Sequence, residues 1–177
     1  MKFELYSHES KLWNIAIRSI NPRQRLFLYG CVFFLLILSC SENNSNKDYP
    51  TNFRGIKWGT KITELQDMVF VESREQLKAY VMENDDLRIG STDIKTVFYL
   101  FSEDFFCGIL VEYQGLDNHK KIKNLYIEKY GNPKIVNEQK MRWEWVWPGE
   151  VGVAVKYDKQ KEAGYLIYLY SPLLFKR

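Results

Sequence analysis

The sequence predicts an α+β domain in which two helices pack on one face of an antiparallel sheet of about five to seven strands. Three observations predict this class. Several short β-rich runs are separated by turn residues, and one segment has helical spacing with both of its ends marked. The elements also occur in the order helix, strands, helix, strands, which favours segregated helices over a parallel sheet with crossovers.

The first element is predicted to be a short helix after Gly59 and Thr60. Ile62, Leu65 and Met68 recur every three residues, which places them on one face of a helix. Seven β-rich runs are then expected as strands, at residues 69–72, 77–82, 96–101, 105–113, 140–147, 151–157 and 165–171. Ser102, Glu103 and Asp104 would form the turn of the third and fourth runs, which predicts a hairpin.

The second helix has the strongest sequence pattern in the chain. Asn118 is suited to the N-cap, and Gly131 followed by Pro133 is typical of a helix end. Between them lies an apolar stripe made of Ile122, Leu125, Tyr126 and Tyr130.

The distribution of charge argues against binding to nucleic acids. The chain has 177 residues and a net charge of +3, and it is 46% hydrophobic and 16% aromatic, which is too apolar for a disordered protein. Residues 1–40 hold five basic and two acidic residues, so residues 41–177 hold twenty of each. A nucleic-acid binder needs a basic surface that displaces counterions, so we expect no nucleic-acid partner.

The first 40 residues have the pattern of a signal peptide. Residues 1–25 form a basic n-region, and residues 26–38 form an uncharged apolar h-region of 13 residues. A membrane-spanning helix needs about 20 apolar residues, so this run is too short to be one. An uncleaved signal anchor is the alternative, and it would place the domain on the same side of the membrane.

Residues 37–40, Ile-Leu-Ser-Cys, resemble the lipobox of bacterial lipoproteins. The resemblance implies cleavage after Ser39, lipidation of the Cys40 thiol and anchoring of the mature protein to a membrane by its acylated N-terminus. Cys31 ends a similar tetrapeptide, but few apolar residues precede it, so we expect an ordinary h-region residue. Ser41 is not the Asp that often retains such proteins at the inner membrane, which favours the outer membrane in a Gram-negative host.

Residues 41–52 are polar and are expected to form a flexible linker, whose reach is roughly 20 Å for twelve residues. Residues 53–177 suffice for a single α+β domain. The segments 53–60 and 130–133 resemble those flanking the helices in small bacterial lipoproteins of the β-lactamase-inhibitor-like or outer-membrane-assembly kind. This resemblance implies a module that binds other proteins and has no catalytic centre.

Motifs for metal, cofactor or nucleophilic chemistry are missing from the sequence, so we expect no catalytic residue, metal or cofactor. His119 has no partner at metal-ligand spacing and is expected to be a solvated residue at a helix start. The acidic segment 83–86 lacks the alternation of a calcium loop and is expected to be a solvated turn. Cys107 lies in an apolar run, which favours a buried thiol.

The segment Trp143-Glu-Trp-Val-Trp147 is the most unusual feature. In a strand, Trp143, Trp145 and Trp147 would share one face, because successive side chains point to opposite sides. They either cover the sheet beneath a helix or form an aromatic strip that binds a glycan or a protein partner. We favour the core, with one indole partly exposed.

Three classes of function remain open. The favoured one is a lipid-anchored cell-envelope protein, located at the membrane through Cys40, whose domain binds or helps assemble an envelope protein or glycan without catalysis. The alternative is a hydrolase of envelope polysaccharide that uses an Asp/Glu pair. A carrier or sensor of a soluble ligand would require a pocket behind the sheet.

Overall fold

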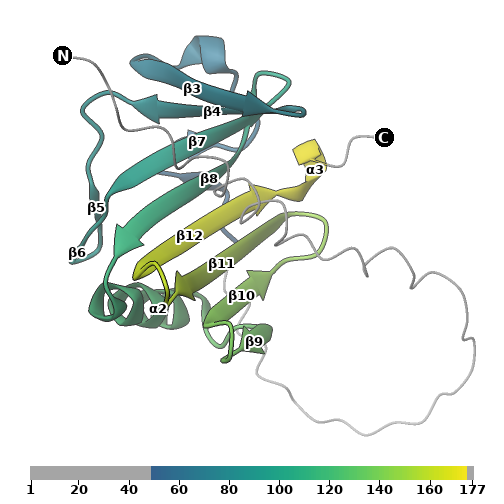
Figure 1. Ribbon diagram of the computed structural model, residues 1–177. Coiled ribbons are helices and arrows are strands. Elements are labelled where there is room, and N and C mark those ends of the chain that lie inside the picture. Colours follow the sequence, from purple (N-terminus) through teal and green to yellow (C-terminus); the bar gives the residue numbers. More distant parts are fainter. Residues whose placement is uncertain (1–48, 175–177) are drawn as a thin grey trace, which may run out of the picture. The chain divides into compact units, whose positions relative to one another are not determined.

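The structure, a computed structural model, describes residues 49–174, and its main feature is an eight-stranded antiparallel sheet (Figure 1). Across the sheet the strands are β3 (Met68–Arg74), β4 (Leu77–Met82), β7 (Thr96–Ser102), β8 (Phe105–Gln114), β12 (Ala163–Tyr170), β11 (Val151–Asp158), β10 (Arg142–Val146) and β9 (Ile135–Asn137). Two small hairpins accompany it, formed by β1 (Asn52–Phe53) with β2 (Ile56–Lys57) and by β5 (Arg88–Ile89) with β6 (Thr92–Asp93).

Three short or medium helical segments complete the described part of the chain. They are the 3-10 turn η3 (Ile62–Glu64), helix α2 (Leu116–Tyr130) and the single turn α3 (Ser171–Leu174). The predicted α+β class with an antiparallel sheet is therefore confirmed, although the large sheet has eight strands and not five to seven. The predicted signal peptide lies outside the described residues.

All seven predicted strands are present, and none of their ends is shifted by more than two residues. In the large sheet the prediction missed β9, whose three residues are all exposed and show no alternation of apolar and polar positions. The two-residue strands β1, β2, β5 and β6 of the small hairpins were also not predicted. The hairpin of β7 and β8 is confirmed, and its turn holds Glu103 and Asp104 at positive φ, as a tight two-residue turn requires.

The helix predicted after Thr60 is wrong. Only η3 forms, and Met68 already belongs to β3. The backbone around Thr60 instead bonds to the neighbouring hairpin: the amide of Ile62 donates to the carbonyl of Asp104 at 2.9 Å, and the amide of Phe106 donates to the carbonyl of Thr60 at 2.8 Å. These tertiary hydrogen bonds compete with the helical ones and limit the helix to one turn.

Helix α2 begins two residues before the predicted N-cap. Asn118 lies in the first turn, where its side-chain amide donates to the carbonyl of Gln114 at 2.9 Å, and Gly115 at φ 86° precedes the helix. The predicted end is confirmed, because Gly131 has φ 78° and its amide donates to the carbonyl of Ile127 at 2.8 Å.

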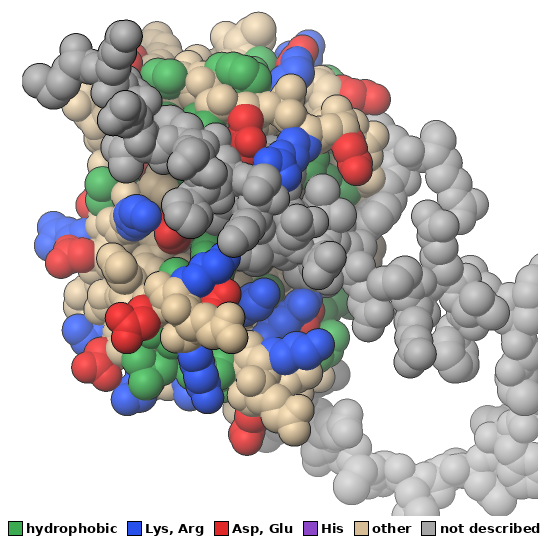
Figure 2. All heavy atoms as spheres, in the orientation of Figure 1, with side chains coloured by type: hydrophobic (Ala, Val, Ile, Leu, Met, Phe, Trp, Pro, Cys, Tyr) green, Lys and Arg blue, Asp and Glu red, His purple; other side chains and the backbone are tan. Residues whose placement is uncertain are grey.

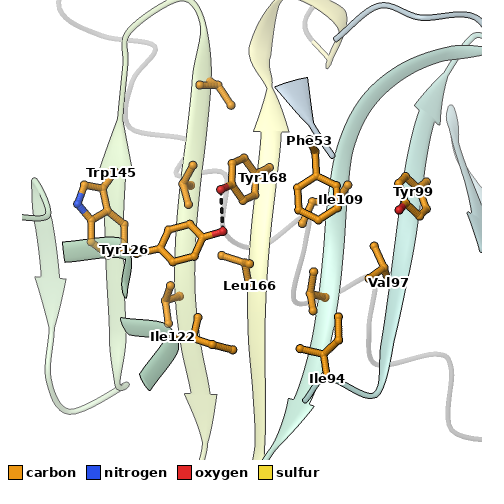
Figure 3. Packing of buried hydrophobic residues seen from close by; sticks show 14 of the residues in the cluster. Phe53, Ile94, Val97, Tyr99, Ile109, Ile122, Tyr126, Trp145, Leu166 and Tyr168 are labelled. Carbon is orange, nitrogen blue, oxygen red and sulfur yellow. Dashed lines mark hydrogen bonds between the residues drawn. The ribbon is translucent and has the colours of Figure 1, made fainter. Parts of the chain in front are cut away.

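The core lies between α2 and the sheet, as Figure 3 shows for its central residues. The hydroxyl of Tyr168 on β12 donates to that of Tyr126 on α2 at 2.7 Å, which satisfies two buried polar groups. Gly164 makes room for the ring of Tyr113: a Cβ at this glycine would lie 1.9 Å from the nearest ring carbon. Hairpin β1–β2 extends the same core, with Phe53 5.8 Å from the ring of Tyr168.

Candidate functional site

Strand β10 and the residue that follows it, Trp147, place the three tryptophans on the face of the sheet that α2 covers. The ring centroid of Trp143 lies 5.3 Å from that of His119, and Trp147 lies 5.2 Å from Tyr130. Trp145, between them, lies 6.0 Å from Tyr126. The sequence prediction that these indoles share one face is confirmed, because all three contact residues of one helix.

The three indoles differ in burial. Trp145 is 2% exposed, and its indole N–H donates to the carbonyl of Gly131 at 2.8 Å, so this residue is part of the core. Trp143 and Trp147 are half-buried at the two ends of the strip. Only these two ends could meet a ligand or a partner without rearrangement of α2.

His119 is buried beneath α2, so the prediction of a solvated histidine is wrong. It is 1% exposed, and its Nδ1 lies 2.9 Å from the hydroxyl of Tyr113. The physical reason is that position 119 lies three residues before Ile122, on the stripe that also holds Tyr126 and Tyr130, and the start of α2 at Leu116 places it inside the helix. Its Nε2 is buried and has no hydrogen-bond partner among the described residues.

The surroundings of His119 keep it neutral. Burial, with a smaller contribution from the nearby Lys123 ammonium, lowers the pKa of His119 to about 4. Burial also raises the pKa of Tyr113 far above its ordinary value. The ammonium of Lys123 lies 5.0 Å from the ring of Trp143 and covers this end of the strip. Tyr113 and His119 therefore form a buried, uncharged pair within the core.

The described residues offer neither a metal-binding cluster nor a reactive cysteine. Among residues 49–174 no three His, Cys, Asp or Glu side chains gather closely enough to hold a metal ion. Cys107 is buried as predicted, its thiol donates to the carbonyl of Leu100 at 3.3 Å, and burial raises its pKa to about 12. A protonated, inaccessible thiol is a poor nucleophile.

The acidic segment 83–86 is solvated, as predicted, except at Asp85. The side chain of Asp85 is only 10% exposed, forms an ion pair with Arg54 and accepts a hydrogen bond from the hydroxyl of Tyr99 at 2.9 Å. Arg54 also donates to the carbonyl of Arg88 at 2.9 Å. This network joins the β1–β2 turn to the 83–95 loop and to β7, a role that the sequence did not indicate.

The reverse face of β10 carries charged residues that sequence reasoning missed. Arg142 lies directly opposite Lys156 in the β10–β11 register, so the two cations are cross-strand neighbours. Burial lowers the pKa of Lys156, and Arg142, Lys161 and Lys140 lower it further, whereas Asp158 raises it. The register follows from the turn at Pro148. If Trp147 is paired with Val151, each step back along β10 is matched by a step forward along β11, and position 142 meets position 156.

Figure 2 shows Lys and Arg side chains gathered on this face where Figure 1 places β10 and β11, with acidic residues among them. The pair Arg142–Glu144 and the pair Lys161–Asp158, at 3.9 Å, balance part of the positive charge. The site thus has two parts on one strand: an aromatic strip under α2 and a partly compensated group of cations behind it.

No protein-family model, curated protein or solved structure matches this chain. Within residues 49–174 no helix is long and apolar enough to cross a membrane. Cys40, the predicted lipidation site, lies outside the described residues.

Proposed function

We propose that this protein is a lipid-anchored component of the bacterial cell envelope whose domain binds or helps assemble an envelope protein or glycan and is not an enzyme. The observation that carries the proposal is the sequence of residues 26–40, an uncharged apolar run that follows a basic segment and ends in Ile-Leu-Ser-Cys. The polar linker 41–52 supports it, because it would keep the domain within roughly 20 Å of the lipid.

The side chains of the domain support a role in binding over one in catalysis. The least exposed carboxylates of the ion pairs in residues 49–174 belong to Asp85, Glu144 and Glu112, and each has a basic partner. Half-buried tryptophans at Trp143 and Trp147 offer apolar area with a polar N–H, the combination that protein interfaces favour. An outer-membrane location is proposed for a host with two membranes, because Ser41 follows the lipidated cysteine.

The anchor can be tested by labelling a bacterial host that expresses the full chain with an alkyne fatty acid. We expect the protein to carry label and a diacylglyceryl mass on Cys40. Cys40→Ala should lose the label, whereas the matched variant Cys31→Ala should keep it. Label that persists in Cys40→Ala, or a wild-type chain without lipid mass, would contradict the proposal.

The binding role can be tested with a photo-crosslinking phenylalanine analogue placed at Trp147. The aromatic replacement keeps most of the packing against Tyr130, while its exposed part reaches any partner. We expect a crosslinked envelope protein or glycan from cells, and no adduct when the same group replaces Lys120 on the outer side of α2. Equal adducts at both positions would show that the contact is not specific to the strip.

A further inference from the structure

Arg142 and Lys156 lie on the face of the sheet opposite α2, and Lys140 and Lys161 lie in the turns before β10 and after β11. We term these four cations the basic cluster. The β10–β11 register sets Arg142 opposite Lys156. The positive charges of Arg142, Lys161 and Lys140 act on Lys156, and so does the opposing negative charge of Asp158, which places these groups within electrostatic reach of Lys156. Lys140 and Lys161 are exposed, and Arg142 and Lys156 are half-buried.

The acidic residues at the cluster compensate only half of its charge. Glu144 pairs with Arg142, and Asp158 pairs with Lys161. Among the ion pairs formed within residues 49–174, none involves Lys140 or Lys156. The cluster therefore keeps a local excess of positive charge, although residues 41–177 as a whole are neutral.

This arrangement is unfavourable for the free domain. Like charges directly opposite each other on neighbouring strands repel, and burial adds a desolvation cost to the charged form of Lys156. A bound anion would offset both effects, because it would neutralise the excess charge and replace the water that Lys156 has lost.

We propose that the basic cluster binds the phosphate headgroups of anionic lipids in the membrane that carries the protein's own anchor. This inference rests on the proposed lipid anchor, because the short segment between Cys40 and the domain would hold the domain close to such headgroups. Basic residues near an anionic bilayer are attracted to it within about one Debye length, so a local cluster suffices even in a neutral domain.

The position of the cluster also defines an orientation. The indole N–H of Trp58 donates to the carbonyl of Pro50 at 2.7 Å and its ring stacks on Tyr170, so the linker enters beside the last residue of β12. Lys161 lies at the other end of β12, two residues before its first residue, Ala163. Eight residues of strand span about 26 Å, so a domain held at both ends would lie with its strands along the membrane.

Lysine footprinting of the full chain in lipid nanodiscs tests the proposal. Nanodiscs of phosphatidylcholine alone are compared with nanodiscs containing about one-third phosphatidylglycerol, and acetylation by a soluble reagent is measured at each lysine by mass spectrometry. We expect acetylation of Lys140 and Lys161 to slow by about threefold or more in the anionic nanodiscs at low salt. The protection should disappear in about 0.5 M salt, because ionic strength screens the contact.

Two controls separate the proposal from general electrostatics. Lys120 and Lys121 on α2 are exposed and should show the same labelling in both nanodiscs. The double variant Lys140→Gln with Lys156→Gln should lose the protection of Lys161, whereas Lys120→Gln with Lys121→Gln, which has the same net charge, should keep it. Soluble phosphate added to neutral nanodiscs should protect none of them.

Any one of three labelling results in nanodiscs would overturn the proposal. They are equal labelling of Lys140 and Lys161 in both nanodiscs, equal protection of Lys120 and Lys121, and protection by free phosphate alone. Protection that occurs in cells and not in anionic nanodiscs would also overturn it, in favour of a protein partner. The mass of Cys40 is recorded in the same samples, so a missing acyl group and a missing headgroup contact are separate results.

Discussion

The two faces of strand β10 differ in the interactions that their side chains make. On one face the tryptophans pack against the rings of α2, and Trp145 is only 2% exposed. On the other face Arg142 and Glu144 form an ion pair with each other and Arg142 faces a second cation across the strand. The first face stabilises the fold, whereas the second carries an electrostatic cost that the fold does not require.

Within the five residues of β10, one face therefore has a structural role and the other is a candidate for binding. Aromatic strips attract attention in a sequence, yet most of this one serves to dock a helix. The group behind it consists of ordinary lysines and an arginine, and only the register of the sheet brings it together. Substitutions on the first face should therefore reduce stability, and substitutions on the second should change binding and leave stability unchanged or improved.

The largest effect is expected for Trp145→Ala. Removing this indole leaves a cavity beneath α2 and an unpaired carbonyl at Gly131, so the free energy of unfolding should fall by about 3–5 kcal/mol. Urea denaturation followed by far-UV circular dichroism measures this loss without relying on tryptophan fluorescence. Trp147→Ala is the matched control: this indole is half-buried, so the loss should be less than half as large. Equal losses would mean that the strip is uniformly structural.

A second, slightly smaller effect should appear as a pH dependence on the same face. The pKa of His119 is about 4 in the folded protein and 6.5 in its ordinary state, so between these values the unfolded chain binds a proton that the folded chain does not. Stability should therefore fall as the pH drops from 6.5 to 4, by about 3 kcal/mol at most, since one pKa unit corresponds to about 1.4 kcal/mol.

His119→Gln provides the comparison for this pH dependence. Glutamine can still bond to the hydroxyl of Tyr113 but does not titrate, so the variant should be less stable at pH 7 and lose less stability on acidification. Urea unfolding at pH 7 and at pH 4.5 measures the difference. If both proteins lose the same amount, the acid sensitivity belongs to other groups.

The smallest effect, and the one of opposite sign, is expected on the reverse face. Lys156→Gln removes the repulsion from Arg142 and the desolvation of an ammonium, so it should raise the free energy of unfolding by roughly 0.2–1 kcal/mol. Lys120→Gln, an exposed substitution on α2, should change it by less than about 0.5 kcal/mol. A clear loss of stability in Lys156→Gln would remove the contrast between the faces.

Local patterns predicted much of the fold. The β7–β8 hairpin, the end of α2 at Gly131 and the shared face of the tryptophans all depend on turn residues, glycine at positive φ or strand alternation, which are readable over a few residues. The failures involve contacts between distant segments. The helix after Thr60 was lost to hydrogen bonds with the β8 end of a hairpin more than 40 residues away.

The candidate site shows the same division. A shift of two or three residues in the start of α2 decided whether His119 faced solvent or the core, and helix starts are among the least certain features of a sequence pattern. The basic cluster was predictable in principle, because both strands and their turn were recognised and register follows from the turn. The ion pair of Arg54 and Asp85 joins residues 31 apart and has no local signature.

The close approach of Tyr113 to Gly164 has a consequence for how this sequence can diverge. Because any side chain at position 164 would occupy the space of the Tyr113 ring, substitutions at these two positions must be coupled. A related sequence with another residue in place of Gly164 must therefore carry a side chain as small as alanine or serine in place of Tyr113. Homologues of this chain should therefore show correlated changes at these two positions, which an alignment of their sequences would reveal.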